Sequence, residues 1–113
     1  MESILTSIKK MLGVSEKDTN FDTDIKIHIN SVLMILTQLG VGPKKGFRIT
    51  DEKETWNDFL GYTADSEYIE GVKTYVYIRV KLVFDPPTSS SLAQALKEEA
   101  KEYEWRLNIQ VDK

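Results

Sequence analysis

The sequence lacks cysteine altogether and has a single histidine, His28, among its 113 residues. Without thiols there can be no disulfides and no thiolate metal site, and one imidazole cannot supply a histidine cluster for zinc or a catalytic pair. We therefore expect a reducing, intracellular place of synthesis and no bound metal. A chain of this length can bury a core of its own, so we expect one domain spanning residues 1–113.

Long apolar runs are also missing. The longest, Val32–Leu36, is far shorter than the ~20 residues that span a bilayer, and residues 1–12 lack the apolar centre and cleavage site of a secretion signal. We expect neither a membrane partner nor secretion by that route. The net charge of -3, with acids and bases interspersed, disfavours a protein whose main ligand is the phosphate backbone of DNA.

No arrangement of residues typical of catalysis is visible. The eighteen Asp and Glu residues fall on expected solvent faces, and no pair stands out as an acid–base couple. His28 is next to the apolar position Ile29 and has no nucleophile at a recognisable spacing. Gly40, Gly42 and Gly46 follow a helix and lack the Gly-Lys-Ser/Thr signature of a phosphate-binding loop. We expect no enzymatic activity and no cofactor.

Helical periodicity is what the chain does have. Apolar residues recur at helical spacing in Glu2–Leu12, in a second segment that starts near Phe21–Thr23, and in Ser91–Leu107. Asn20 or Asp22 is the expected cap of the second helix. This helix is expected to end at Leu39–Pro43, where two glycines and a proline follow the last periodic residue.

A short third helix is a less direct prediction. Thr50 or Asp51 is the expected cap of a short third helix that ends at Leu60–Gly61, with Trp56 and Phe59 as core anchors.

The fourth segment, Tyr68–Val83, fits both a strand-like alternation and a helical stripe. We favour a helix capped by Asp65 or Ser66, because the segment exceeds the usual strand length and no second strand could satisfy its backbone. The prolines within Phe84–Ser90 then form a corner, after which Thr88, Ser89 or Ser90 can cap the last helix. The predicted fold is all-α, a bundle of four to five helices whose antiparallel long helices meet at this corner.

Candidate interface residues lie in three places. Lys44, Lys45 and Arg48 form a small basic loop that could touch a phosphate or an acidic partner, although such loops are more often simply solvated. Trp105 lies off the expected buried stripe of the last helix, so we expect it at the surface. The stripe itself comprises Leu92, Leu96, Ala100, Tyr103 and Leu107. Beyond it, the end segment Asn108–Lys113 carries the remaining candidates, Asn108, Ile109 and Val111.

Several of these motifs occur in an order and at intervals that resemble a known family. They are Asp24-Ile25 with Ile29-Asn30, then Leu39-Gly40-Val41-Gly42-Pro43, Trp56, Phe84-Asp85-Pro86-Pro87 and Glu104-Trp105-Arg106-Leu107. The pattern resembles the small head–tail connector proteins, also called adaptor or head-completion proteins, of tailed bacteriophages and prophages. The likeness runs from Ile4 to Leu107, with no match at Gly61–Glu67.

The resemblance implies an all-helical, non-enzymatic subunit that assembles into a ring, dodecameric by analogy, beneath the portal protein. It implies a second partner on the tail side, a stopper or tail-completion protein, and an axial channel through which DNA passes without sequence-specific binding. Its place would be the head–tail junction of the virion, after assembly in the host cytoplasm. By analogy, Asn108–Lys113 would dock on the portal, and the loop Gly42–Thr50 would face the channel or a neighbouring subunit.

A small helical DNA-binding regulator encoded by a prophage is the alternative. Thr23–Gly61 could form a helix-turn-helix, but its recognition helix would be Glu52–Leu60, whose acids would repel the phosphates beside the major groove.

Overall fold

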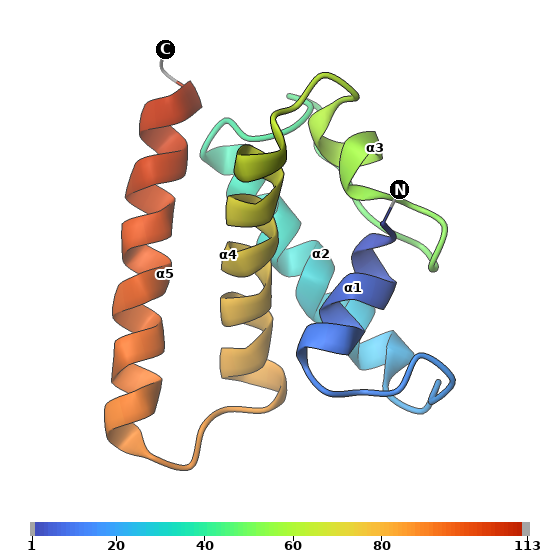
Figure 1. Ribbon diagram of the computed structural model, residues 1–113, viewed down its shortest axis with the longest axis vertical. Coiled ribbons are helices and arrows are strands. Elements are labelled where there is room, and N and C mark those ends of the chain that lie inside the picture. The colour runs from blue at the N-terminus through green and yellow to red at the C-terminus, as the bar shows by residue number, and fades with distance from the viewer. Residues whose placement is uncertain (1, 112–113) are drawn as a thin grey trace.

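The computed structural model describes residues 2–111, with side chains to residue 109. It contains five helices: α1 (Ile4–Met11), α2 (Asp22–Gln38), α3 (Trp56–Leu60), α4 (Ser66–Phe84) and α5 (Ser90–Val111) (Figure 1). Within residues 2–111 there is no strand, only an isolated bridge between Ser3 and Thr55. The predicted all-α bundle is confirmed.

Helix α4 forms the centre of the bundle. It packs against α2 and α5, and α1 closes over α2 and α4. The strand-like alternation of Tyr68–Val83 is therefore helical, as favoured from its length, because α4 has neighbours on more than one side and buries several residues. Asp65 caps it, accepting a hydrogen bond of 3.1 Å from the amide of Glu67. Its buried residues are Val72, Tyr75, Val76, Ile78 and Val80.

The double-proline corner joins α4 to α5, which run antiparallel in Figure 1. Ser89 Oγ accepts a hydrogen bond of 3.3 Å from the amide of Leu92, which confirms a hydroxyl cap from this segment. In the stripe of α5 that was expected to be buried, Ala100 and Leu107 are buried. The expectation is wrong for Leu92, whose side chain is 52% exposed. The reason is its position in the first turn of α5, which extends beyond the end of α4 (Figure 1).

The last helix is also longer than expected, because α5 continues to Val111 instead of ending at Leu107. The segment Asn108–Lys113 is therefore no separate tail as far as the structure describes it. Residues 112–113 lie outside the described residues.

The expected cap of α2 is wrong. The helix starts after Phe21, which makes no side-chain cap bond, and Asp22 lies in the first turn. There Asp22 forms an ion pair with the buried Lys9, at 2.7 Å between Oδ1 and Nζ. Lys9 also donates to the carbonyls of Glu16 and Asp18, so a buried lysine fixes the connection between α1 and α2.

The expected start of α3 is wrong as well. Glu54 accepts hydrogen bonds from the amides of Thr50 and Asp51, but no helix follows there, because the carbonyl of Glu54 accepts from the amide of Ile4 and Thr55 forms a bridge with Ser3. The helix begins instead after Thr55, whose side chain forms a capping box with Asp58. The structured helix is only Trp56–Leu60, so the nine-residue recognition helix of the DNA-binding alternative does not exist.

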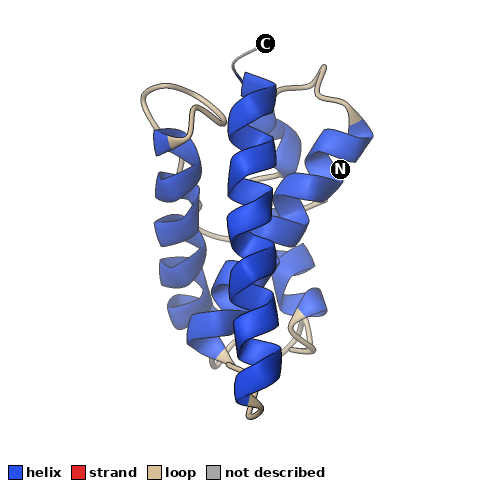
Figure 2. Ribbon diagram, turned by 90° about the vertical axis from the view of Figure 1, so that its left-hand side faces the viewer, coloured by secondary structure: helices blue, strands red, loops and turns tan. Residues whose placement is uncertain are grey.

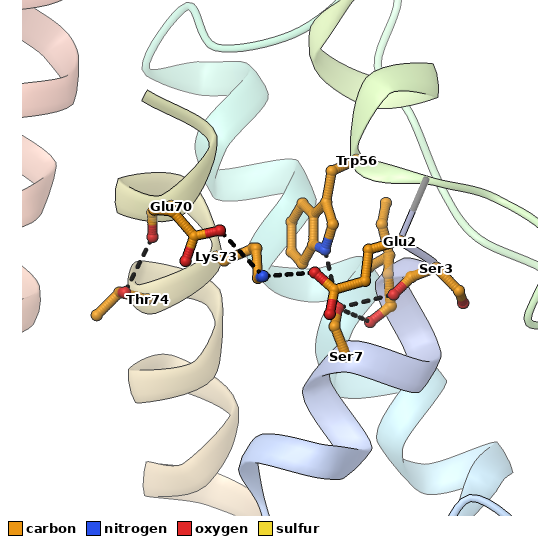
Figure 3. A network of polar contacts seen from close by, with 8 residues as sticks. Glu2, Ser3, Ser7, Trp56, Glu70, Lys73 and Thr74 are labelled. Carbon is orange, nitrogen blue, oxygen red and sulfur yellow. Dashed lines mark hydrogen bonds and ion pairs between the residues drawn. The ribbon is translucent and has the colours of Figure 1, made fainter. Parts of the chain in front are cut away.

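Trp56 and Phe59 are buried, as expected of core anchors. The indole Nε1 of Trp56 donates to Ser7 Oγ, and Ser7 in turn donates to the carbonyl of Ser3 (Figure 3). Beside this contact, Lys73 of α4 pairs with Glu2 and Glu70. These contacts fasten α3 and the start of the chain to α1 and α4.

Candidate functional site

A loop, residues 41–50, leaves the C-terminal end of α2 through a Schellman motif. The amide of Val41 donates to the carbonyl of Leu36 at 2.9 Å, and that of Gly40 to Thr37 at 3.0 Å. Gly40 has φ of 90°, the left-handed conformation that this motif requires. The predicted end of the helix is confirmed by these bonds. Val41 is buried, so the loop starts from a fixed point.

Asn30 holds the far end of the loop. Its side-chain amide donates to the carbonyl of Ile49 at 3.0 Å, and its Oδ1 accepts from the amide of Ile49 at 2.7 Å. The side chain thus pairs with the backbone as a neighbouring strand would. Ile49 is buried, and Lys26 donates to the next carbonyl, that of Thr50, at 3.2 Å. Sequence reasoning missed this role, although an asparagine beside the apolar Ile29 was a usable signal.

The middle of the loop is packed against α3. The rings of Phe47 and Phe59 lie 5.3 Å apart. Gly42, with φ of 83°, lies so close to Phe59 that an added Cβ would be 2.4 Å from its ring. A turn follows, closed by a 2.9 Å bond from the amide of Gly46 to the carbonyl of Pro43. This turn presents Lys44 and Lys45 at its tip.

Between this loop and the outer face of α2 lies a groove of about 690 Å³. Its floor includes Ile27 and Met34, two apolar side chains of α2 that are 57% and 59% exposed. Lys45 and Arg48 lie on the loop side, and no acidic residue lines it. The lining residues are Ile27, Asn30, Ser31, Met34, Thr37, Lys45, Gly46, Phe47 and Arg48. The groove suits an apolar side chain accompanied by negative charge.

The predicted loop residues therefore belong to one surface. Lys45 and Arg48 line the groove, and Lys44 is exposed next to them. Within the described part of the chain none of these three cations forms an ion pair. The apolar floor was not predicted, because Ile27 and Met34 form part of a groove only when the loop folds beside α2.

None of the predicted α5 residues whose side chains the structure describes lines this groove. Trp105 is 65% exposed. Figure 2 shows that no other helix covers the outer side of α5. Asn108 instead makes an internal contact, donating to the carbonyl of Leu39 at 3.2 Å. Ile109 is half-buried, and the side chain of Val111 lies outside the described residues. Trp105 does not line the groove of its own subunit.

A second hollow, of about 510 Å³, lies beside the proline corner. Phe21 and Val83 are exposed there, and the rings of Phe21 and Phe84 pack edge to face at 5.7 Å. His28 lines the same hollow, half-buried and 6.5 Å from the Phe84 ring, as expected of a residue at the core boundary. The lining residues are Val14, Phe21, Asp24, His28, Val83, Phe84 and Asp85.

Two further properties bear on the kind of site. Among the described residues, no group of three or more His, Asp or Glu side chains is placed to hold a metal ion. In the same part of the chain, no helix combines the length and apolar character needed to cross a membrane.

Comparison with known protein families gives a match over almost the whole chain. A family model described as "Phage connector protein" matches residues 4–113. No curated protein and no solved structure matches the chain at a significant level.

Proposed function

The chain belongs to the phage connector protein family, and on this basis we propose that it is a head–tail connector of a tailed phage or prophage. The observation that carries the proposal is the extent of the family match, residues 4–113. In this role the protein is structural and not an enzyme. It occupies the head–tail junction of the virion and is assembled in the bacterial host.

The connector acts as a ring of identical subunits, dodecameric by analogy with the family, with a channel through which DNA passes without being read. Rings need heterologous interfaces, in which two different patches of one subunit meet on neighbouring copies. The exposed floor of the groove and the exposed Trp105 are two such patches on one subunit. The net charge of -3 suits a channel that lets DNA slide and does not grip it.

The two ends of the bundle serve two partners. The C-terminal end of α5, with Ile109, lies opposite the proline corner in Figure 1. We assign the C-terminal end to the portal protein. The corner end, with the exposed Phe21 and Val83 beside its hollow, is assigned to the tail-side stopper or tail-completion protein.

A binding assay with the portal protein encoded in the same genome tests this proposal. The full chain is expected to co-purify with the portal, whereas a chain ending at Ile109 is expected to bind much more weakly. This truncation keeps the Asn108 contact with Leu39, so its melting temperature should stay close to that of the full chain. Phe21→Ser is the matched control at the other end and should bind the portal normally. A full chain that does not bind the portal overturns the proposal.

A further inference from the structure

We propose that the groove between α2 and the loop receives helix α5 of a second copy of this chain, with Trp105 of that copy on the floor formed by Ile27 and Met34. The inference rests on the proposed ring and specifies its subunit interface.

The apolar surfaces of the two patches match in kind. Among the large hydrophobic side chains that the structure describes, Trp105 has the highest exposed fraction, 65%. Tryptophan is one of the residue types enriched among the few that dominate protein interfaces. On the groove side, Ile27 and Met34 are seven residues apart on α2 and so lie on one face of that helix. Burying these three side chains together removes apolar area from water, which favours association.

The charges beside the two apolar patches are also complementary. At 100° per residue, Glu98 and Glu102 fall within about 60° of Trp105 on one side of α5, whereas Lys97 and Lys101 fall on its other side. Glu98 forms no ion pair among the described residues, and Glu102 pairs only with Arg106 at the surface.

The cations of the groove, in contrast, all lie on its loop side, at Lys45 and Arg48. With Trp105 on the floor, the acidic flank of α5 faces the loop in one of the two directions that the helix can take along the groove. This arrangement favours one orientation of the incoming helix.

Met34, the floor residue nearer the end of α2, and Trp105 lie at similar heights in the subunit, and matching heights favour a closed ring. Asn108 of α5 contacts Leu39 at the end of α2, with 3.2 Å between Nδ2 and the carbonyl oxygen. Trp105 lies about 4.5 Å before Asn108 along α5, and Met34 about 7.5 Å before Leu39 along α2. Patches at similar heights allow a ring about an axis along α5 to close, whereas patches at different heights would generate a helical filament.

DNA in the channel is the competing occupant for the cations of the loop. A phosphate backbone needs charge but no apolar floor. The exposure of Ile27 and Met34 directly beside Lys45 and Arg48 therefore favours a protein surface.

Disulfide cross-linking tests the contact directly, because the native chain has no cysteine. Ser31→Cys places a thiol on the groove side, and Lys101→Cys places one beside Trp105. When the two variants are mixed at high concentration under mild oxidation, we expect the mixed disulfide dimer to dominate. Each variant alone should give little dimer. Disulfides between two Ser31→Cys chains or two Lys101→Cys chains that match the mixed product would indicate a two-fold contact and overturn the inference.

A charge exchange gives an independent test. Lys45→Glu/Arg48→Glu makes both patches acidic, and Glu98→Lys/Glu102→Lys makes both basic, so each variant alone should associate about tenfold more weakly or worse. An equal mixture of the two restores opposite charges at every contact and should assemble like the unmodified chain. Lys17→Glu/Lys53→Glu is the matched control, because it makes the same charge change at exposed sites outside the groove.

The outcomes separate this inference from the proposed function. Rings that form without the mixed disulfide overturn the inference and leave the connector role intact. A short DNA duplex that binds the unmodified chain but not Lys45→Glu/Arg48→Glu, again without the mixed disulfide, assigns the groove to DNA. A chain that neither cross-links nor self-associates, alone or on portal-containing heads, contradicts both the inference and the ring.

Discussion

Trp56 and Ser7 are joined by a hydrogen bond of 2.8 Å between indole Nε1 and Oγ, although they lie 49 positions apart in the chain. Both residues are buried. Ser7 Oγ donates in turn to the carbonyl of Ser3 at 2.7 Å, so a small polar chain crosses the packed contact between α1 and α3. Buried polar groups of this kind stabilise a fold only while every member has its partner.

Removing the hydroxyl should therefore cost more than removing both partners. Ser7→Ala leaves the indole N–H of Trp56 buried without an acceptor, and we expect the free energy of unfolding to fall by about 1–3 kcal/mol. Urea denaturation measures the loss. Thr6→Ala, on the same helix, is the control. A loss no larger than that of the control would show that the hydrogen bond contributes little.

The basic loop should depend on Asn30. Asn30→Leu removes both bonds to Ile49, so we expect a loss of about 1–3 kcal/mol in stability. It should also speed trypsin cleavage after Lys44, Lys45 or Arg48, because the loop opens more often. Ser31→Ala, one position along α2, should change neither. Unchanged cleavage in Asn30→Leu would mean that packing of Phe47 alone holds the loop.

The loop should also respond to acid through Glu54. Burial raises the pKa of this carboxyl, but hydrogen bonds from Thr50 and Asp51 outweigh that effect and hold the pKa below its ordinary 4.5. A lowered folded-state pKa means that the stabilisation is present above 4.5 and is lost as the pH falls through the folded-state value. Glu54→Gln should remove this part of the acid sensitivity. Equal slopes of unfolding free energy against pH in the two proteins would refute it.

Neighbouring positions on α5 should separate stability from association. Leu107 is buried, so Leu107→Ala should cost on the order of 2–4 kcal/mol in unfolding free energy. Trp105→Ala should change stability by less than about 0.5 kcal/mol, because its side chain is exposed. It should nevertheless weaken self-association. Thermal and urea denaturation measure the first effect and sedimentation velocity the second. A destabilised Trp105→Ala would place this side chain in the core and not at an interface.

The long helices could be predicted from sequence because several independent local signals agree for each of them. Tyr68–Val83 alternates like a strand, yet its length and the lack of a pairing strand leave only a helix, and Asp65 caps it as expected. The end of α2 needs a residue in the left-handed conformation, and Gly40 supplies it. These requirements are local, so they can be recognised in the sequence alone.

The helix starts that were wrong depend on distant partners. Asp22 looked like a cap but pairs with Lys9 of α1. Thr50 and Asp51 looked like caps, but the residues that follow them, Glu54 and Thr55, pair with Ile4 and Ser3 at the start of the chain instead of forming a helical turn. In each case a competing hydrogen-bond partner decides the boundary, and propensity alone does not weigh such competition.

In the candidate site, too, local features could be predicted and features that depend on distant contacts could not. The cations of the loop and the exposed position of Trp105 were predicted from their place relative to the helical stripes. The groove was not, because it requires Asn30 to draw the loop alongside α2 and so set Lys45 beside Ile27 and Met34. A tertiary contact of this kind leaves only a weak trace in one sequence.

Electron microscopy of the chain co-expressed with the portal protein of its own genome tests the central claim most directly. We expect a ring of copies of this chain attached to one face of the portal, with an open axial channel and with α5 closer to the portal than the proline corner is. A portal without added density, or the chain bound as scattered single copies with no ring, would contradict the account.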